Sequence, residues 1–294
     1  MDYKLLTFKA VAFTKSFTTA ARNLNISQPA VSKTIKNLEN EYGKALFNRK
    51  ANTIELTADG RLFLIYAEKI IDLYTTLKEE LSTGNQSIPK QLKIGASTTI
   101  AYHIIPKLIA FIQADYPDTK FNLISGNTTE IQEFILKHQL DFAVVEGENH
   151  NKRLSYQKFV KDELVLVTRA QNLAVSDTIT KEELIDLPFI KREIGSGSLQ
   201  VIENNLDNHR IKLNNIQSIL GSTESIKNYL QYTNCFAFIS IHSINRELLD
   251  NRLRIIEIEG LSIERWFYFI SRQGFQSRSA KKLQLLFKQA YNKK

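Results

Sequence analysis

The sequence predicts an α/β protein with a small helical N-terminal domain, one long connecting helix and a larger domain of alternating strands and helices. The length of 294 residues suffices for about two domains. Short helical patterns with almost no glycine or proline fill residues 1–57, and a single long helical pattern covers 58–83. From Pro89 onward, short β-rich runs alternate with amphipathic helices. We therefore predict three segments, 1–58, 59–88 and 89–294.

Composition and charge indicate a globular protein with a basic N-terminal end. Hydrophobic residues make up 43% of the chain and charged residues 24%, an ordinary balance for a folded protein. The net charge is +8, and residues 1–58 hold nine basic side chains against four acidic ones. This local excess predicts a polyanionic partner, with nucleic acid as the first candidate, for the N-terminal domain.

Neither a membrane span nor a secretory signal is expected. No stretch approaches 18 apolar residues, and charged residues such as Lys4 and Lys9 interrupt the apolar N-terminus. The single cysteine, Cys235, excludes an internal disulfide, fits a reducing compartment and is expected to be a buried, inert thiol. We predict a cytoplasmic protein with no membrane partner.

Three short helices are expected in the first 57 residues. Thr18 is a natural N-cap for the second helix, and Ser27 is one for the third, whose first turn contains Pro29. The third helix has an apolar face formed by Val31, Ile35 and Leu38. Its other side carries Gln28, Pro29, Ser32, Lys33 and Lys36.

That second face is what a DNA recognition helix needs, because N-terminal residues would meet base edges and lysines would meet phosphates. A short two-stranded segment over 49–56 follows, and its tip at 50–53 is a candidate wing against the DNA backbone. A structural helical module with a solvated basic face is the alternative for this segment.

The spacing of residues in this region resembles the winged helix-turn-helix of LysR-type transcriptional regulators. The match runs through Ser16-Phe17-Thr18, Ala20-Ala21, Leu24, Ser27 to Ser32, Ile35, Leu38-Glu39, Gly43, Leu46-Phe47, Arg49, Leu56-Thr57 and Gly60. The resemblance implies binding to an interrupted palindrome in double-stranded promoter DNA. The residues expected to contact DNA are Thr18, Arg22, Ser27, Gln28, Pro29, Ser32, Lys33, Lys36 and Arg49.

The long helix has an apolar seam. Thr57 is its expected N-cap, Gly84 its expected end, and the seam has spacings of three and four residues: Phe63, Tyr66, Ile70, Leu73, Leu77 and Leu81. Either the seam packs against its own domain or it pairs two chains. The resemblance implies dimerisation through this helix, with assembly to a homotetramer as in the family, and allows RNA polymerase as a further partner.

The remainder of the chain has a βαβαβ pattern that occurs twice. It resembles the two-lobed, periplasmic-binding-protein-like effector domain of LysR-type regulators, with two doubly wound α/β subdomains. The expected first lobe covers about 89–162 and 268–294, and the second covers about 163–267. The family often has a Gly-x-Gly stretch where this chain has Tyr232–Phe236, and we expect Asn234 to adopt the left-handed conformation instead.

Three clusters of hydroxyl side chains fall where strands end and helices begin, which is where open α/β sheets bind ligands. Simple helix capping is the alternative for each cluster. With the inter-lobe pocket that the resemblance implies, the expected effector-binding residues are Ser97, Thr98, Thr99, Glu146, Ser196, Ser198 and Thr223.

The charge of the effector stays open at this point. Hydroxyls and helix N-termini favour an anion, to which Lys191, Arg192 or His103 could add positive charge. Glu146, Glu193 and Glu224 lie near the same helix ends and favour a zwitterion or an amine.

Catalysis is not expected. The five histidines lack metal-ligand spacing, and no nucleophile elbow, Walker loop or dinucleotide fingerprint is present. We predict a ligand-responsive regulator that is not an enzyme, with no metal and no cofactor other than a small-molecule effector. The competing prediction is a cytosolic small-molecule-binding α/β protein or enzyme whose helical appendage does not bind DNA.

Overall fold

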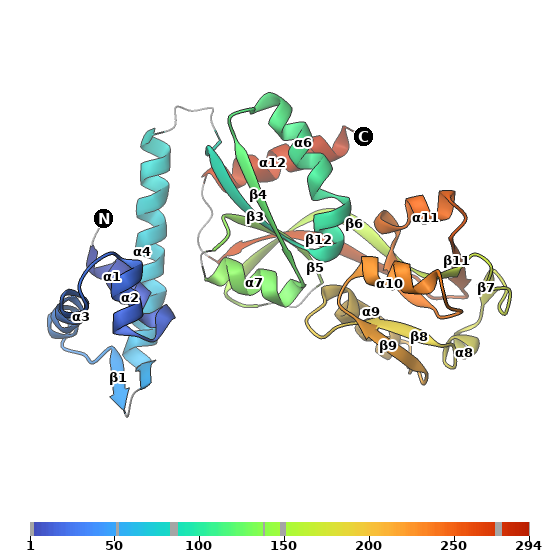
Figure 1. The fold of residues 1–294 in the computed structure, drawn as a ribbon, viewed down its shortest axis with the longest axis horizontal. Coiled ribbons are helices and arrows are strands. Elements are labelled where there is room, and N and C mark those ends of the chain that lie inside the picture. Colours follow the sequence, from blue (N-terminus) through green and yellow to red (C-terminus); the bar gives the residue numbers. More distant parts are fainter. Residues whose placement is uncertain are drawn as a thin grey trace. The chain divides into compact units, whose positions relative to one another are not determined.

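The computed structural model describes residues 3–50, 53–82, 88–137, 139–147, 151–273 and 278–293. The chain forms two compact units, Met1–Ser87 and Ile88–Lys294. Figure 1 shows the ribbon of each unit, and the two are described separately below. Within the described ranges, no helix is long and apolar enough to cross a membrane.

The first unit consists of helices around a small aromatic core, together with a hairpin. Its elements are α1 (Tyr3–Thr14), α2 (Phe17–Asn23), α3 (Gln28–Tyr42), the antiparallel strands β1 (Phe47–Lys50) and β2 (Thr53–Leu56), and α4 (Ala58–Ser82). Phe8 is fully buried, with ring centroids 5.1 Å from Phe47 and 4.7 Å from Phe63. Val31, Ile35 and Leu38 of α3 are buried in the same cluster, as predicted.

The helix starts are set by side-chain caps, and the predicted cap of α2 is wrong. The N-cap of α2 is Ser16, whose extended backbone lets its hydroxyl accept from the Thr19 amide, so Thr18 lies inside the helix. A cap hydroxyl reaches the amide three residues on, and Ser16 stands in that relation to Thr19. Ser27 caps α3 and the Thr57 hydroxyl caps α4 by accepting from the Gly60 amide, both as predicted.

Helix α4 has two apolar faces with different surroundings. Ala67 and Ile71 are buried in the core of the first unit. The predicted seam is exposed, apart from the half-buried Phe63: Tyr66, Ile70, Leu73, Leu77 and Leu81 are 57%, 51%, 63%, 51% and 80% exposed. Thus the helix packs on its own domain through one face and leaves the seam uncovered within one chain. The expected end at Gly84 lies outside the described residues.

The second unit has a mixed sheet with strand order β4-β3-β5-β12-β6-β11-β7, and β10 also pairs with β6. The strands β3 (Gln91–Ser97), β4 (Lys120–Gly126) and β5 (Phe142–Glu146) run parallel in the first lobe. Helices α6 (Ile105–Asp115) and α12 (Arg278–Asn292) pack on each other, and α7 (Thr128–Leu136) contacts β3 and β5. The short α5 (Thr98–His103) begins directly after β3.

Two long strands link the lobes (Figure 1). β6 (Leu154–Arg169) and β12 (Ile263–Arg272) pair antiparallel along most of their length. Val160 of β6 belongs to the core of the first lobe, whereas Leu164 belongs to the core of the second. The sequence indicated the parallel strands but not this antiparallel pair.

The second lobe repeats the alternation of strands and helices. Its elements are β7 (Thr178–Ile179), α8 (Lys181–Leu184), β8 (Phe189–Arg192), α9 (Gly197–Asn208), β9 (Ile216–Leu220), α10 (Thr223–Leu230), β10 (Ala237–Ser240), α11 (Asn245–Leu249) and β11 (Leu253–Ile258). β8 pairs parallel with β9, and a bridge between Phe189 and Phe236 joins β8 to the start of β10.

Asn234 does not adopt the expected left-handed conformation. It is not among the described residues with positive φ. Its side-chain oxygen accepts from Arg169 Nε at 2.7 Å, and its backbone oxygen accepts from Asn172 at 3.2 Å. These two bonds hold the turn without a glycine. Cys235 beside it is buried, as predicted.

Candidate functional sites

The exposed face of α3 presents a set of polar side chains at its N-terminal end. Ser27 accepts from the Ala30 amide, and Pro29 occupies the first turn, where a missing N–H costs little. Gln28 and Pro29 are exposed, and Ser32 is half-buried. The Gln28 amide nitrogen donates to the Ser32 hydroxyl at 3.0 Å, so these side chains, one turn apart, are ordered against each other.

Basic side chains flank this face. Lys33 and Lys36 of α3 and Arg22 of α2 are exposed, and within the ranges that the structure describes none of them takes part in an ion pair. Thr18 is also exposed on α2. Arg49 lies on β1, but its side chain and the residues at the wing tip, 51 and 52, lie outside the described part.

Glu39 fixes the hairpin relative to α3, a role that was not predicted from the sequence. One carboxylate oxygen accepts from the Leu46 amide at 2.9 Å and from the Phe47 amide at 3.2 Å. The Thr57 hydroxyl, which follows the second strand, donates to the Ala45 carbonyl at 2.7 Å at the same open end of the hairpin. No local pattern in the sequence indicates that a helix residue would accept from these two consecutive amides.

Four of the residues considered for the effector site meet where the lobes touch. Thr99 at the start of α5 and Thr223 at the start of α10 place their hydroxyl oxygens 3.1 Å apart, and both side chains are buried. Arg192 at the end of β8 donates to the Thr98 hydroxyl at 3.1 Å and to the Thr223 hydroxyl at 3.3 Å. The same guanidinium therefore binds hydroxyls from both lobes.

Glu146 lies at the centre of a buried polar chain. Its carboxylate accepts from the Ser97 hydroxyl and, at 3.3 Å, from the Ser198 hydroxyl. Ser198 in turn accepts from Arg265 of β12 at 2.7 Å, and Arg265 Nε donates to Asp162 of β6 at 2.6 Å. These bonds connect the inter-lobe contact to the two long strands. Neither Asp162 nor Arg265 was predicted, because they are far apart in sequence.

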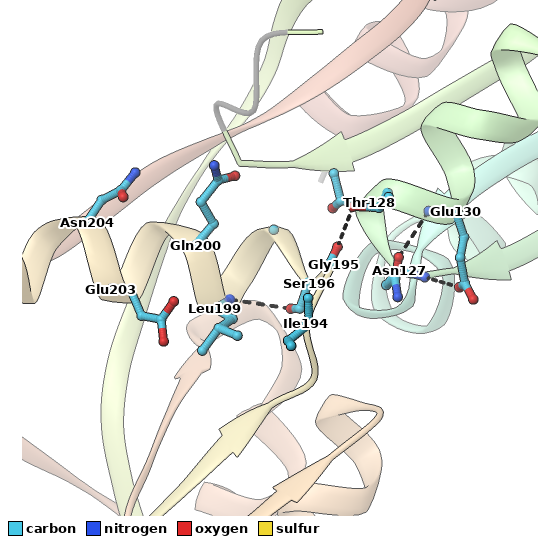
Figure 2. A pocket seen from close by; sticks show the side chains of 12 residues that line it. Asn127, Thr128, Glu130, Ile194, Gly195, Ser196, Leu199, Gln200, Glu203 and Asn204 are labelled. Atoms are coloured by element: carbon cyan, nitrogen blue, oxygen red, sulfur yellow. Dashed lines mark hydrogen bonds between the residues drawn. The ribbon is translucent and has the colours of Figure 1, made fainter. Parts of the chain in front are cut away.

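Ser196 lies apart from the Thr98, Thr99 and Thr223 group. It is the N-cap of α9 and accepts from the Leu199 amide, which is the alternative that the sequence left open for it. It lines a pocket of 460 Å³ between the N-termini of α7 and α9. Figure 2 shows Asn127, Thr128 and Glu130 on one side of this pocket and Gln200, Glu203 and Asn204 on the other. None of Ser97, Thr98, Thr99 and Thr223 lines it.

Gly197 allows the close approach beside this pocket. A Cβ at Gly197 would collide with the backbone oxygen of Glu146 and lie 2.6 Å from the Thr128 hydroxyl oxygen. Both neighbours belong to the first lobe, so the lobes touch here through a residue that has no side chain. The Thr129 amide also donates to the Gly195 carbonyl at 3.2 Å across the same contact.

A further contact between the lobes carries charge. His103 Nε2 of α5 lies 2.8 Å from a carboxylate oxygen of Glu224 in α10, which Lys227 also approaches at 2.9 Å. Burial raises the pKa of Glu224, but the hydrogen bonds and positive charge of Lys227 and His103 outweigh burial and hold that pKa below its ordinary value. In the described residues, no group of three or more His, Cys, Asp and Glu side chains is arranged to hold a metal ion.

A helix-turn-helix with a hairpin wing and a two-lobed α/β unit with polar side chains between its lobes define a class: a DNA-binding regulator with a small-molecule-binding domain. Residues 3–61 match the family model described as a bacterial regulatory helix-turn-helix protein of the lysR family, and residues 85–291 match the LysR substrate binding domain. The chain belongs to the LysR family of transcriptional regulators. The resemblance and fold expected from the sequence are thus confirmed.

Relatives and solved structures agree with this assignment. A probable RuBisCO transcriptional regulator of Phaeodactylum tricornutum is 33% identical over 283 residues, covering 94% of this chain and 92% of the relative. A full-length OxyR variant of Pseudomonas aeruginosa has a TM-score of 0.73 at 16% identity, covering 98% of this chain and 93% of that one. The regulatory domain of Synechocystis PCC6803 CcmR, solved in complex with 2-PG, is 27% identical with a TM-score of 0.62, covering 69% of this chain and 98% of that one.

Proposed function

We propose that this regulator binds promoter DNA through α3 and the β1–β2 wing, and that a small effector bound between the lobes changes that binding. The contact of Thr99 with Thr223, together with the bonds of Arg192 to Thr98 and Thr223, is the observation that carries the effector site. The complex of CcmR with 2-PG supports a small ligand for a domain of this kind. The proposed effector-binding residues at this contact are Ser97, Thr98, Thr99, Glu146, Ser198 and Thr223, and Ser196 would contribute only from the neighbouring pocket that it lines.

The proposed DNA contacts follow from exposure and charge. Gln28, Pro29 and Ser32 face base edges from the N-terminal turn of α3, which is how a recognition helix reads the major groove. The remaining contacts, mostly to phosphate, come from Thr18, Arg22, Ser27, Lys33, Lys36 and Arg49.

The exposed seam of α4 supports a homodimer, and pairing of the seams would place two copies of α3 on half-sites of an interrupted palindrome. Assembly to a tetramer and contact with RNA polymerase at the promoter are part of this proposal. The regulator acts in the cytoplasm and has no catalytic activity of its own, as its relatives named transcriptional regulators suggest. In this proposal the first lobe covers residues 89–162 and 268–294, and the second lobe covers residues 163–267.

The DNA-binding part is tested with the Lys33→Gln/Lys36→Gln double variant. The full chain first selects duplexes from a random library, and we expect enrichment of inverted repeats whose half-sites are about one helical turn apart. On the selected duplex, the double variant should bind more weakly, and the slope of log K against log salt should flatten by about one unit per lost phosphate contact.

Lys137→Gln, at the residue that follows α7, removes a lysine from the second unit and is the control. An unchanged slope in the double variant would show that these lysines do not contact phosphate, and no enrichment at all would contradict sequence-specific binding.

The effector part is tested by thermal shifts of the full chain against small anions, dicarboxylates, amino acids and sugar phosphates. A ligand at 100 times its dissociation constant should add about 2.7 kcal/mol of stability. The Thr99→Val/Thr223→Val variant should lose this shift, whereas Ser155→Ala on the exposed part of β6 should keep it. A ligand that stabilises the double variant as well as the parent chain would place the site elsewhere.

A further inference from the structure

We propose that Arg192 is the anchor for an oxyanion group of the effector, a carboxylate or a phosphate, and that the Glu193 carboxylate competes with the effector for this anchor. This inference rests on the proposed function, because it concerns the same inter-lobe site. It selects an effector with a negatively charged group from the classes that the sequence left open.

The guanidinium of Arg192 is already arranged as an oxyanion receptor. Nε donates to one oxygen of Glu193 at 2.8 Å, and Nη2 donates to the other at 2.9 Å. This two-pronged pairing is the geometry in which arginine binds carboxylates and phosphates. A ligand oxyanion placed on the same two nitrogens would reproduce the pairing that Glu193 makes.

The two partners differ in their access to water. The Arg192 side chain is 3% exposed, whereas that of Glu193 is 25% exposed. Glu193 therefore has solvent beside it, and its carboxylate can be hydrated when it leaves the guanidinium. By contrast, Asp162, the partner of the buried Arg265, is 0% exposed and has no such route. Arg192 is thus a buried cation whose carboxylate partner, Glu193, can be exchanged for another.

Two hydroxyls complete the receptor. Thr98 and Thr223 accept from Nη2 and Nη1 of Arg192, which leaves the hydroxyl proton of Thr98 directed elsewhere. A hydroxyl that accepts from a guanidinium can donate its own proton to the oxyanion beside it. Since Thr98 belongs to the first lobe and Arg192 to the second, an oxyanion held by both would strengthen the contact between the lobes.

The other acidic side chains near the site are already engaged. Glu224 pairs with His103 and Lys227, and Glu146 accepts from Ser97 and Ser198. Lys191, next to Arg192 in sequence, pairs with Glu203 at 3.2 Å. In the described residues, each of these carboxylates thus has partners other than the Arg192 guanidinium.

The experiment removes the internal competitor. Glu193→Gln should bind inorganic phosphate or acetate about tenfold more tightly than the parent chain, as expected for the loss of one partly exposed charge partner. Binding is measured by calorimetry on the full chain and by thermal shifts against chloride at equal ionic strength. Phosphate and acetate are separate arms, so their ratio shows which oxyanion the anchor prefers. Glu203→Gln, which removes the carboxylate paired with Lys191, is the matched control and should behave as the parent chain.

The combined variant Arg192→Lys/Glu193→Gln keeps the positive charge but lacks the two guanidinium nitrogens that pair with an oxyanion. It should lose most of the affinity for phosphate or acetate that Glu193→Gln gains. Equal phosphate and acetate affinity in Glu193→Gln and the parent chain would overturn the proposal, and so would full retention of the gain in the combined variant.

A separate readout distinguishes this proposal from the proposed function. If Glu193→Gln binds the anion through Arg192 but DNA affinity does not respond, the anchor stands and the regulatory role of the cleft fails. If a ligand changes DNA binding equally in the parent chain and in Arg192→Lys, the cleft stands and the anchor fails.

Discussion

At the scale of single residues, side chains that join two separate backbone segments have the clearest consequences. Glu39 is one such residue, because one carboxylate oxygen receives the amides of Leu46 and Phe47. Both amides belong to the start of the wing. Their position relative to the recognition helix therefore depends on one side chain of that helix.

Glu39→Ala should destabilise the first unit by about 1–3 kcal/mol, because two half-buried amides lose their acceptor. Urea denaturation of the full chain, monitored with a spectroscopic probe in the first unit, measures this change in the free energy of unfolding. Glu41→Ala is the control, since Glu41 pairs with Lys4 at the surface and such pairs contribute about 0–1 kcal/mol. Similar losses in the two variants would contradict the role of Glu39.

Glu224 makes the contact between the lobes sensitive to acid. Its pKa lies below the ordinary value of 4.5 because the bonds from His103 and Lys227 outweigh burial. A carboxyl group with a lowered pKa in the folded state adds stability above its unfolded pKa, and this stability is lost as pH falls through the folded pKa. Glu224→Gln should therefore flatten the fall in unfolding temperature below about pH 4.5. His103→Gln should show part of this effect, and an unchanged curve in Glu224→Gln would contradict it.

At the scale of elements, the two apolar faces of α4 have different surroundings. Ala67 and Ile71 face the core of the first unit, and the seam residues face outward. Leu73→Glu/Leu77→Glu should convert the dimer to monomers while leaving the fold of the first unit intact, because neither side chain is buried there.

Sedimentation velocity across a concentration series checks this prediction. Phe13→Glu places a charge on an exposed apolar residue of α1 and is the control. A double variant that sediments as the parent chain does would exclude the seam as the interface.

The sequence was most informative about elements with strong local patterns. Val31, Ile35 and Leu38 repeat with helical spacing, and Ser27 stands before Pro29 at a helix start, so both faces of α3 and its N-cap were predicted correctly. Thr18 is a good cap residue and was predicted to cap α2, but Ser16 is equally good and has the required extended backbone. Local composition does not distinguish two hydroxyl residues that stand two positions apart.

At the scale of the whole molecule, several hydrogen bonds between residues far apart in the chain were not predicted. Asp162 and Arg265 are 103 residues apart, and neither shows a local pattern that would pair them. The pairing of β6 with β12 depends on register, which hydrophobic alternation alone does not determine. The hydroxyl clusters were predicted because they follow a general rule of α/β sheets, while the way that Arg192 joins two of them required coordinates.

Asp162→Ala should destabilise the second unit by about 3–5 kcal/mol, because it leaves Arg265 charged and buried without its partner. Thermal unfolding of the full chain measures the loss. Asp162→Ala/Arg265→Met should recover much of the lost stability, because it removes the unpaired charge as well. If the double variant is no more stable than the single one, then an uncompensated charge is not the cause.

Gly197 sets how closely the two lobes can approach each other. The backbone of the first lobe rests against its Cα hydrogen, with no space for a methyl group. An alanine methyl group at this position would push the first and second lobes apart, with or without a ligand. The closest approach of the two lobes at this point is therefore limited by the size of the side chain at position 197.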